Sequence, residues 1–184
     1  MKRNVRCDPG AVLLLGLLLF SLTIRELAAL FTAAIVHEAG HLIALMIVGT
    51  SLNGIHFTVS GPVILYHQPE EKWKVVFCAL SGPLLGLLLF CALRHAWTDC
   101  AEISLLLSII NLLPVLPLDG GRALNALLVG QIRFVIPVFG FLIPFSFMMT
   151  GLVLTYQKQG GSGLLMFGSW LLILTCQEPR FDVK

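Results

Sequence analysis

The chain has 184 residues, of which 57% are hydrophobic and only 12% are charged, and its net charge is +2. A water-soluble domain of this length could not bury so much apolar surface, which excludes an ordinary soluble protein. So small a net charge also gives no reason to expect a nucleic-acid partner.

Six apolar runs follow one another along the chain and predict membrane helices. A helix needs about 20 apolar residues to cross a bilayer, so the first, fourth and sixth runs are short. They would have to tilt, or to thin the bilayer locally. We therefore predict an all-α, multi-pass integral membrane protein with about six transmembrane helices, over residues Gly10–Ile24, Leu27–Val48, Val75–Leu93, Ile103–Leu118, Ile132–Tyr156 and Leu164–Cys176.

The first run is similar to a secretory signal, because Lys2, Arg3 and Arg6 precede an apolar stretch. Residues 21–25 that follow it fit the small-x-small pattern of a cleavage site poorly. We therefore interpret this run as a retained first helix.

The second run contains the sequence His37-Glu38-Ala39-Gly40-His41. Residues four apart lie on one face of a helix, so both imidazoles can bind a single zinc ion. Glu38 would then lie beside the metal, where a carboxylate can take a proton from zinc-bound water. Titratable side chains are costly inside a membrane, and their presence there indicates a functional site. The motif predicts hydrolytic chemistry within the membrane.

The stretch between the second and third runs, Gly49–Lys74, has a pattern of its own. Residues 55–60 alternate apolar and polar, which is typical of a strand. Gly61-Pro62 interrupts the pattern, and residues 63–66 could form a second strand. We predict a short β-hairpin or re-entrant segment here, whose exposed edge could pair with an extended peptide. An ordinary amphipathic loop on the membrane surface is the alternative, and both stay open.

The fourth run ends in the sequence NLLPVLPLDGGR over residues 111–122. Pro114 and Pro117 disrupt helical hydrogen bonding, and Gly120-Gly121 is expected to release the chain. Irregular backbone at membrane depth is tolerated only against protein or a water-filled cavity. Asp119, which we place at the end of this span, would be costly in lipid without a partner. It is our candidate for the third protein ligand that a catalytic zinc site has besides water.

Basic residues predict the orientation of the chain, because they are enriched on the cytoplasmic side of membrane proteins. With both termini in the cytoplasm, that side carries nine of them and the opposite side carries three, Arg25, Arg94 and Lys158. His37 and His41 would then lie roughly 10–17 Å below the cytoplasmic surface, at 1.5 Å per helical residue. The site is therefore expected to open towards the cytoplasm.

The two motifs together resemble those of the site-2 protease family of intramembrane zinc metalloproteases, and the compact arrangement is similar to the bacterial sporulation-type branch. The resemblance implies that His37, His41 and Asp119 bind one zinc ion, with Glu38 as general base and proton shuttle. It associates Asn111 with substrate or transition-state contacts. It also implies a single membrane-embedded domain over residues 1–184, with a catalytic core at about 27–122.

The resemblance further implies a membrane-tethered protein substrate, such as a sigma-factor precursor, an anti-sigma factor or a signal-peptide remnant, in a bacterial cell membrane. The sequence departs from the family in two respects. Gly86 stands where relatives often have an asparagine after a Gly-Pro motif, here Gly82-Pro83. We also expect neither a PDZ insertion nor a nucleotide-sensing CBS domain.

Two other functions use the same residues. A metal transporter or channel would need polar residues along a path across the membrane, but Thr32 is the only such residue between Leu27 and Val36. A catalytically inactive scaffold would not need Glu38, because a purely structural zinc site does not use that carboxylate.

Overall fold

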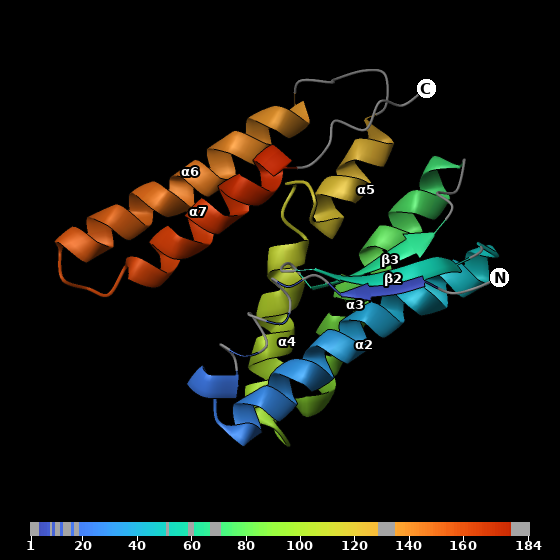
Figure 1. The fold of residues 1–184 in the computed structure, drawn as a ribbon, viewed down its shortest axis with the longest axis horizontal. Helices are drawn as coiled ribbons and strands as arrows, with labels where there is room; N and C mark the ends of the chain where they lie inside the picture. Colours follow the sequence, from blue (N-terminus) through green and yellow to red (C-terminus); the bar gives the residue numbers. More distant parts are fainter. Residues whose placement is uncertain are drawn as a thin grey trace. The chain divides into compact units, whose positions relative to one another are not determined.

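A computed structural model describes residues 4–7, 9, 12, 16, 19–50, 52–58, 61–66, 71–128 and 135–177. The chain forms two compact units, Met1–Ile110 and Asn111–Lys184, which are described separately. Helices make up most of the described residues, and a small sheet belongs to the first unit (Figure 1).

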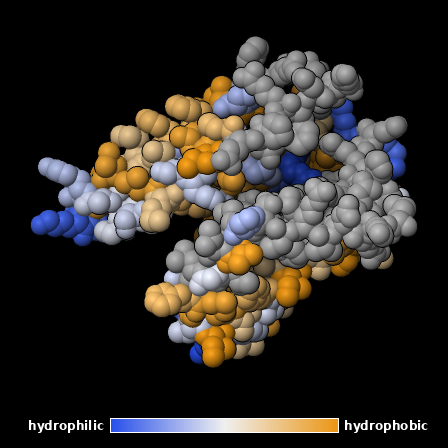
Figure 2. Space-filling view, viewed as in Figure 1, coloured by the Kyte–Doolittle hydropathy of each residue, from blue (hydrophilic) through white to orange (hydrophobic). Residues whose placement is uncertain are grey.

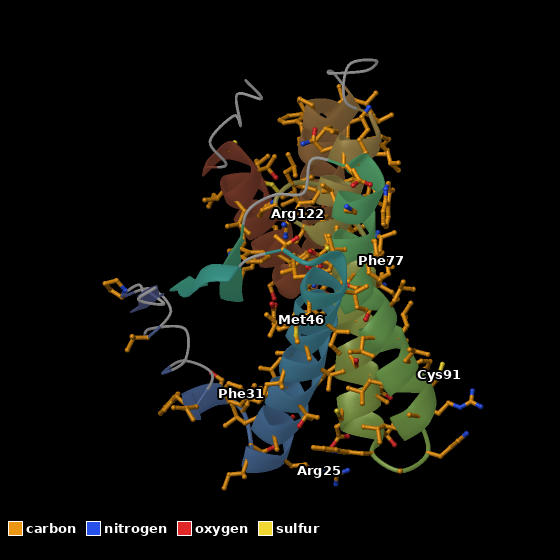
Figure 3. All side chains as sticks on the ribbon, turned by 90° about the vertical axis from the view of Figure 1, so that its right-hand side faces the viewer. Arg25, Phe31, Met46, Phe77, Cys91 and Arg122 are labelled. Carbon is orange, nitrogen blue, oxygen red and sulfur yellow. The ribbon has the colours of Figure 1, made fainter. Side chains whose placement is uncertain are left out.

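The first unit is built around helices α2 (Ile24–Val48) and α3 (Lys72–Leu93), which lie side by side (Figures 1 and 3). Figure 3 shows Arg25 and Cys91 at one end of this pair and Met46 and Phe77 towards the other, so the two helices run in opposite directions. Helix α4 (Thr98–Asn111) follows α3 after a short turn.

Local signals set both ends of α2. Thr23 and Glu26 form a capping box, in which the Glu26 backbone N–H donates to Thr23 Oγ1 and the Thr23 N–H donates to Glu26 Oε2 at 2.8 Å. Gly49 ends the helix with φ at 75°, a left-handed conformation that glycine adopts without steric cost.

Glu71 lies just before α3, where it accepts hydrogen bonds from Lys74 and from Trp73 Nε1. These contacts lower the pKa of the Glu71 carboxyl, the larger effect coming from Lys74. The Glu71 side chain is exposed.

The sheet contains strands β1 (Asn4–Cys7), β2 (Leu52–Thr58) and β3 (Gly61–Tyr66), in the order β1-β2-β3. β2 and β3 pair antiparallel directly after α2, where the alternating sequence indicates a hairpin. The expected interruption at Gly61-Pro62 is wrong, because both residues belong to β3 and pair with Thr58 and Phe57. β1 pairs parallel with β2, with Asn4 opposite Gly54 and Cys7 opposite Phe57. The sequence analysis did not predict β1, because four residues are too few to show a strand period.

Small residues let α2 and α3 approach closely. A Cβ atom added to Gly40 would lie 2.5 Å from the Ser81 carbonyl oxygen. Around this contact Ala44, Leu45 and Cys78 form a buried apolar cluster. The cluster holds the two helices together one turn away from His41.

Three described helices are long and apolar enough to cross a membrane: α2, α3 and α6 (Val135–Tyr156). α7 (Ser162–Gln177) has a shorter apolar stretch. The predicted first helix lies partly outside the described residues, and the total of about six stays a prediction.

The predicted fourth span is wrong in its bounds. Ile103–Leu118 does not form one helix: α4 ends at Asn111, and a separate helix, α5 (Asp119–Leu127), begins after a loop. Pro114 and Pro117 lie in that loop. Proline lacks the N–H that a helix requires and also disfavours helical conformation in the residue before it.

In the second unit, α6 and α7 form a helical hairpin with a tight contact between the helices. Gly151 is buried there, and a Cβ atom on it would lie 2.5 Å from the Leu165 backbone nitrogen. Figure 2 shows a mostly hydrophobic surface on this hairpin, with a hydrophilic patch at the turn, which contains the exposed residues Gln157, Lys158 and Gln159.

Candidate metal centre

Helix α2 places His37 and His41 on one face, with both side chains buried at 4% and 9% exposure. Their ring centroids are 5.0 Å apart, and the two Nε2 atoms are separated by 3.3 Å. The spacing of four residues thus brings two potential metal ligands together, as the sequence predicts.

The separation of the two nitrogens fits a shared zinc ion. Zinc binds histidine nitrogen at about 2.0–2.1 Å in tetrahedral geometry, which places two such ligands about 3.3–3.4 Å apart. The distance between the Nε2 atoms lies in this range, so the spacing of the pair fits one shared ion.

A contact with α3 assigns the tautomer of His41. His41 Nδ1 lies 2.7 Å from the Cys78 carbonyl oxygen. A carbonyl only accepts hydrogen bonds, so Nδ1 carries the hydrogen in the neutral ring and Nε2 presents its lone pair. Metal-binding histidines commonly donate their other ring N–H in this way. This is the tautomer in which Nε2 can act as a metal ligand.

Glu38 follows His37 directly on α2 and is half-buried. At 3.6 residues per turn it is rotated by about 100° from His37 and by about 60° from His41. Its carboxylate therefore arises beside the histidine face rather than on it, a placement that suits proton transfer better than coordination.

Asp119 lies in the second unit as the first residue of α5, and it is 6% exposed. The start of a helix carries partial positive charge and stabilises a carboxylate. Arg122 Nη1 lies 3.8 Å from Asp119 Oδ1, a charge–charge contact longer than a hydrogen bond. Asp119 thus begins α5, whereas the sequence analysis placed it at the end of a span.

Gly120 and Gly121 also differ from expectation, because they belong to the first turn of α5. A Cβ atom on Gly120 would lie 2.1 Å from the Leu112 carbonyl oxygen, and one on Gly121 would lie 2.4 Å from the Val115 carbonyl carbon. The two glycines therefore let the preceding loop pack against the helix that starts with Asp119.

Asn111 is the last residue of α4 and is half-buried.

In the first unit, Gly86 packs against α4, where a Cβ atom would lie 2.3 Å from Ser108 Oγ. Ser104 Oγ donates to the Gly86 carbonyl at 2.9 Å, and Ser108 Oγ donates to the Ser104 carbonyl at 2.8 Å. Serine hydroxyls of α4 thus occupy the space beside Gly86.

The sequence analysis missed the part that α3 plays in this site. Cys78 and Gly82 both contact the His41 ring, although each lies about forty residues further along the chain. A glycine next to a proline inside an apolar helix was the signal available, but its partner could not be read from the sequence.

Comparisons with known proteins agree with this geometry. The site-2 protease from Methanocaldococcus jannaschii superposes with a TM-score of 0.67 over 98% of this chain and 93% of its own, at 19% identity. A Synechocystis sp. protein with the provisional name of zinc metalloprotease is 30% identical over 53% of this chain. That match spans 30% of the length of the Synechocystis protein. No family model matches the chain.

These findings confirm the resemblance to the site-2 protease family that the two motifs indicate. The chain has the site-2 protease fold over nearly its whole length. The branch within the family is not distinguished by either similarity.

Proposed function

We propose that this chain is a zinc-dependent intramembrane endopeptidase of the site-2 protease family, close to its bacterial sporulation-type branch. The observation that carries the proposal is the buried pair of histidines on α2, whose Nε2 atoms are 3.3 Å apart. The pair lies inside a helix long and apolar enough to cross a membrane. Such a position is costly unless the site has a function.

The membrane setting is supported by the surface of the helices. Large apolar side chains are exposed on both α2 and α6, among them Ile35, Ile47 and Phe141. Apolar surface of this extent indicates contact with lipid or with another protein.

His37, His41 and Asp119 would hold one zinc ion, because two imidazole nitrogens and a carboxylate oxygen form a donor set that fits it. Three protein ligands leave one coordination position open for catalysis. When bound, zinc supplies Lewis acidity that polarises the scissile carbonyl and makes water a better nucleophile.

Glu38 then acts as the general base. Its carboxylate accepts a proton from the attacking water and afterwards donates it to the leaving amine. Asn111 could donate a hydrogen bond from its amide to the oxyanion that develops on the substrate carbonyl. Burial of the two histidines limits the contact of their rings with bulk water.

The substrate class follows from the position of the site in the membrane. The backbone of a spanning helix is fully hydrogen-bonded, so a transmembrane substrate must unwind locally before it can be cut. Among the described strands β1 and β3 are the two edge strands, and the outer edge of β3 could hold the unwound segment as an added strand. A sigma-factor precursor, an anti-sigma factor or a signal-peptide remnant would suit such a site.

We also propose that both termini lie in the cytoplasm and that the site opens towards the cytoplasm. Two features of the first unit support this orientation. Arg25 Nε lies 2.5 Å from Asp99 Oδ2, so the starts of α2 and α4 share one end of the unit. The pairing of β1 with β2 brings the N-terminal segment to the end where α2 finishes.

Co-expression with candidate membrane-tethered substrates tests the proposal. Glu38→Gln removes the base and keeps the size of the side chain, so cleavage is expected to fall by about 10²–10⁴-fold, the usual contribution of general-base catalysis. Immunoblotting of the substrate measures the cleaved fraction. Cleavage that persists at the wild-type level in Glu38→Gln would refute the mechanism, and metal uptake without cleavage would indicate a transporter instead.

A further inference from the structure

We propose that Gly82 of helix α3 is a positioning residue for the metal site, because it keeps open the space that the metal-binding end of the His41 ring occupies. The inference rests on the proposed zinc site and concerns how α3 prepares one of its ligands. The position of the His41 ring would thus depend on the backbone of α3 at Gly82 as well as on the two histidines of α2.

The first observation is the distance between Gly82 and the ring. A Cβ atom on Gly82 would lie 2.2 Å from His41 Nε2, 2.6 Å from Cε1 and 2.8 Å from Cδ2. Real Cβ atoms essentially never show contacts under 3.0 Å. Any side chain at this position would therefore displace the ring at the nitrogen that faces His37.

The second observation is that the ring is held at its other end. His41 Nδ1 donates to the Cys78 carbonyl oxygen at 2.7 Å. Cys78 and Gly82 are one helical turn apart, about 5.4 Å along the axis of α3. The imidazole therefore spans one turn of α3, fixed by a hydrogen bond at one nitrogen and resting on bare backbone at the other.

The Cys78 carbonyl is itself well defined. Ser81 Oγ donates to the same oxygen at 2.7 Å, so side chains from both helices converge on this carbonyl. The acceptor that orients His41 is thus oriented by a neighbour on its own helix.

Neither helix can yield easily to a side chain at Gly82. Gly40 precedes His41, and a Cβ atom on Gly40 would lie 2.9 Å from the Gly82 Cα. The backbones already approach as closely as two glycines allow. Moving α3 outwards would lengthen the bond from His41 to Cys78, and rotating the ring would break it. Both responses disturb the direction of the Nε2 lone pair.

Gly86 provides a matched control on the same helix. It lies one turn beyond Gly82 and is also buried, and a Cβ atom on it would lie 2.3 Å from Ser108 Oγ. Gly82→Ala and Gly86→Ala therefore add the same methyl group to α3 with similar crowding. Only the first of them touches a proposed ligand.

The experiment measures zinc affinity of the purified full-length protein by competition with a chelator, together with the visible spectrum after substitution by cobalt. Gly82→Ala is expected to weaken zinc binding about 10–100-fold, the range found when outer-shell partners of metal ligands are changed. Its cobalt spectrum should also change, because the geometry around the metal changes. Gly86→Ala should retain wild-type affinity and spectrum.

Three outcomes would overturn the role of Gly82. Wild-type affinity and spectrum in Gly82→Ala would show that the ring tolerates the methyl group. Equal losses of zinc affinity in the two variants would show that both glycines serve only helix packing. A wild-type protein that binds no zinc would refute the metal site, and with it the proposed function. Wild-type zinc binding with an unchanged Gly82→Ala would refute the positioning role alone.

A double variant decides the case in which Gly82→Ala does not fold. His41→Ala removes the ring that the new methyl group would strike, so His41→Ala/Gly82→Ala is expected to recover the helical content and the monodispersity of His41→Ala alone. Such coupling is expected only between residues in contact. Failure to recover would locate the clash elsewhere and overturn the proposal.

Discussion

Two imidazole nitrogens 3.3 Å apart, inside an apolar helix, are the basis for the functional interpretation at the residue scale. The sequence predicts this pairing because a spacing of four residues on a helix leaves little choice of geometry. The hydrogen bond from His41 to Cys78 could not be predicted, since it joins residues 37 positions apart. It depends on the packing of two helices and on the glycines that permit it.

Asp119 gives the sharpest test of the proposed ligand set. Asp119→Ala removes the carboxylate from the start of α5 while leaving the two histidines in place. We expect the zinc content of the purified variant to fall well below one ion per chain, because a third protein ligand is lost. Atomic absorption measures the content. Asp119→Asn serves as the isosteric control, and wild-type stoichiometry and affinity in Asp119→Ala would contradict the assignment.

Gly86 shows at the residue scale what a departure from a family pattern can mean. Relatives often have asparagine at this position, whereas here hydroxyl groups from α4 fill the space. Ser104 and Ser108 are almost fully buried, so a larger side chain at position 86 would have to displace packed atoms of α4. The asparagine side chain of the relatives is therefore absent here, and close packing of α3 against α4 takes up the space.

At the scale of elements, sequence patterns located long helices better than their interruptions. Apolar runs predicted α2, α3, α6 and α7 to within a few residues. The fourth run failed because apolar residues continue through Pro114 and Pro117, so hydropathy alone could not separate the loop from the helix. The nine-residue helix α5 was missed because its start, Asp119-Gly120-Gly121, has low helix propensity.

The α6–α7 hairpin allows a prediction with a control inside the same element. Gly151→Ala places a methyl group 2.5 Å from the Leu165 backbone nitrogen, so it should destabilise the protein by about 1–3 kcal/mol, as overpacking does. Gly163→Ala meets no atom within 4 Å and should be neutral or stabilising by up to about 1 kcal/mol, because alanine is the better helix former.

Unfolding of the two variants in mixed micelles measures both effects. The informative quantity is the difference in stability between the two variants, since both replace a glycine by alanine. Equal stabilities for Gly151→Ala and Gly163→Ala would contradict the close contact between α6 and α7.

At the scale of the whole molecule, composition and motif spacing together predicted a mainly helical chain and the family whose fold it shares, but not the number of its spans. High apolar content excluded a soluble domain, and two short motifs about eighty residues apart indicated the family whose fold the structural similarity confirms. The small sheet was only half anticipated. The alternating sequence indicates its hairpin but misplaces the interruption at Gly61-Pro62, and β1, which pairs with β2, was not predicted.

The central claim is that zinc and Glu38 together cut a membrane-tethered substrate, and one measurement on purified protein in liposomes tests it most directly. Zinc is removed with a chelator and then restored, and cleavage of a single-span model substrate is followed in wild type and in Glu38→Gln. We predict that wild-type cleavage stops and then returns with zinc, while Glu38→Gln holds the same amount of zinc and does not cleave. Wild-type cleavage that continues without zinc, or undiminished cleavage by Glu38→Gln, would contradict the account.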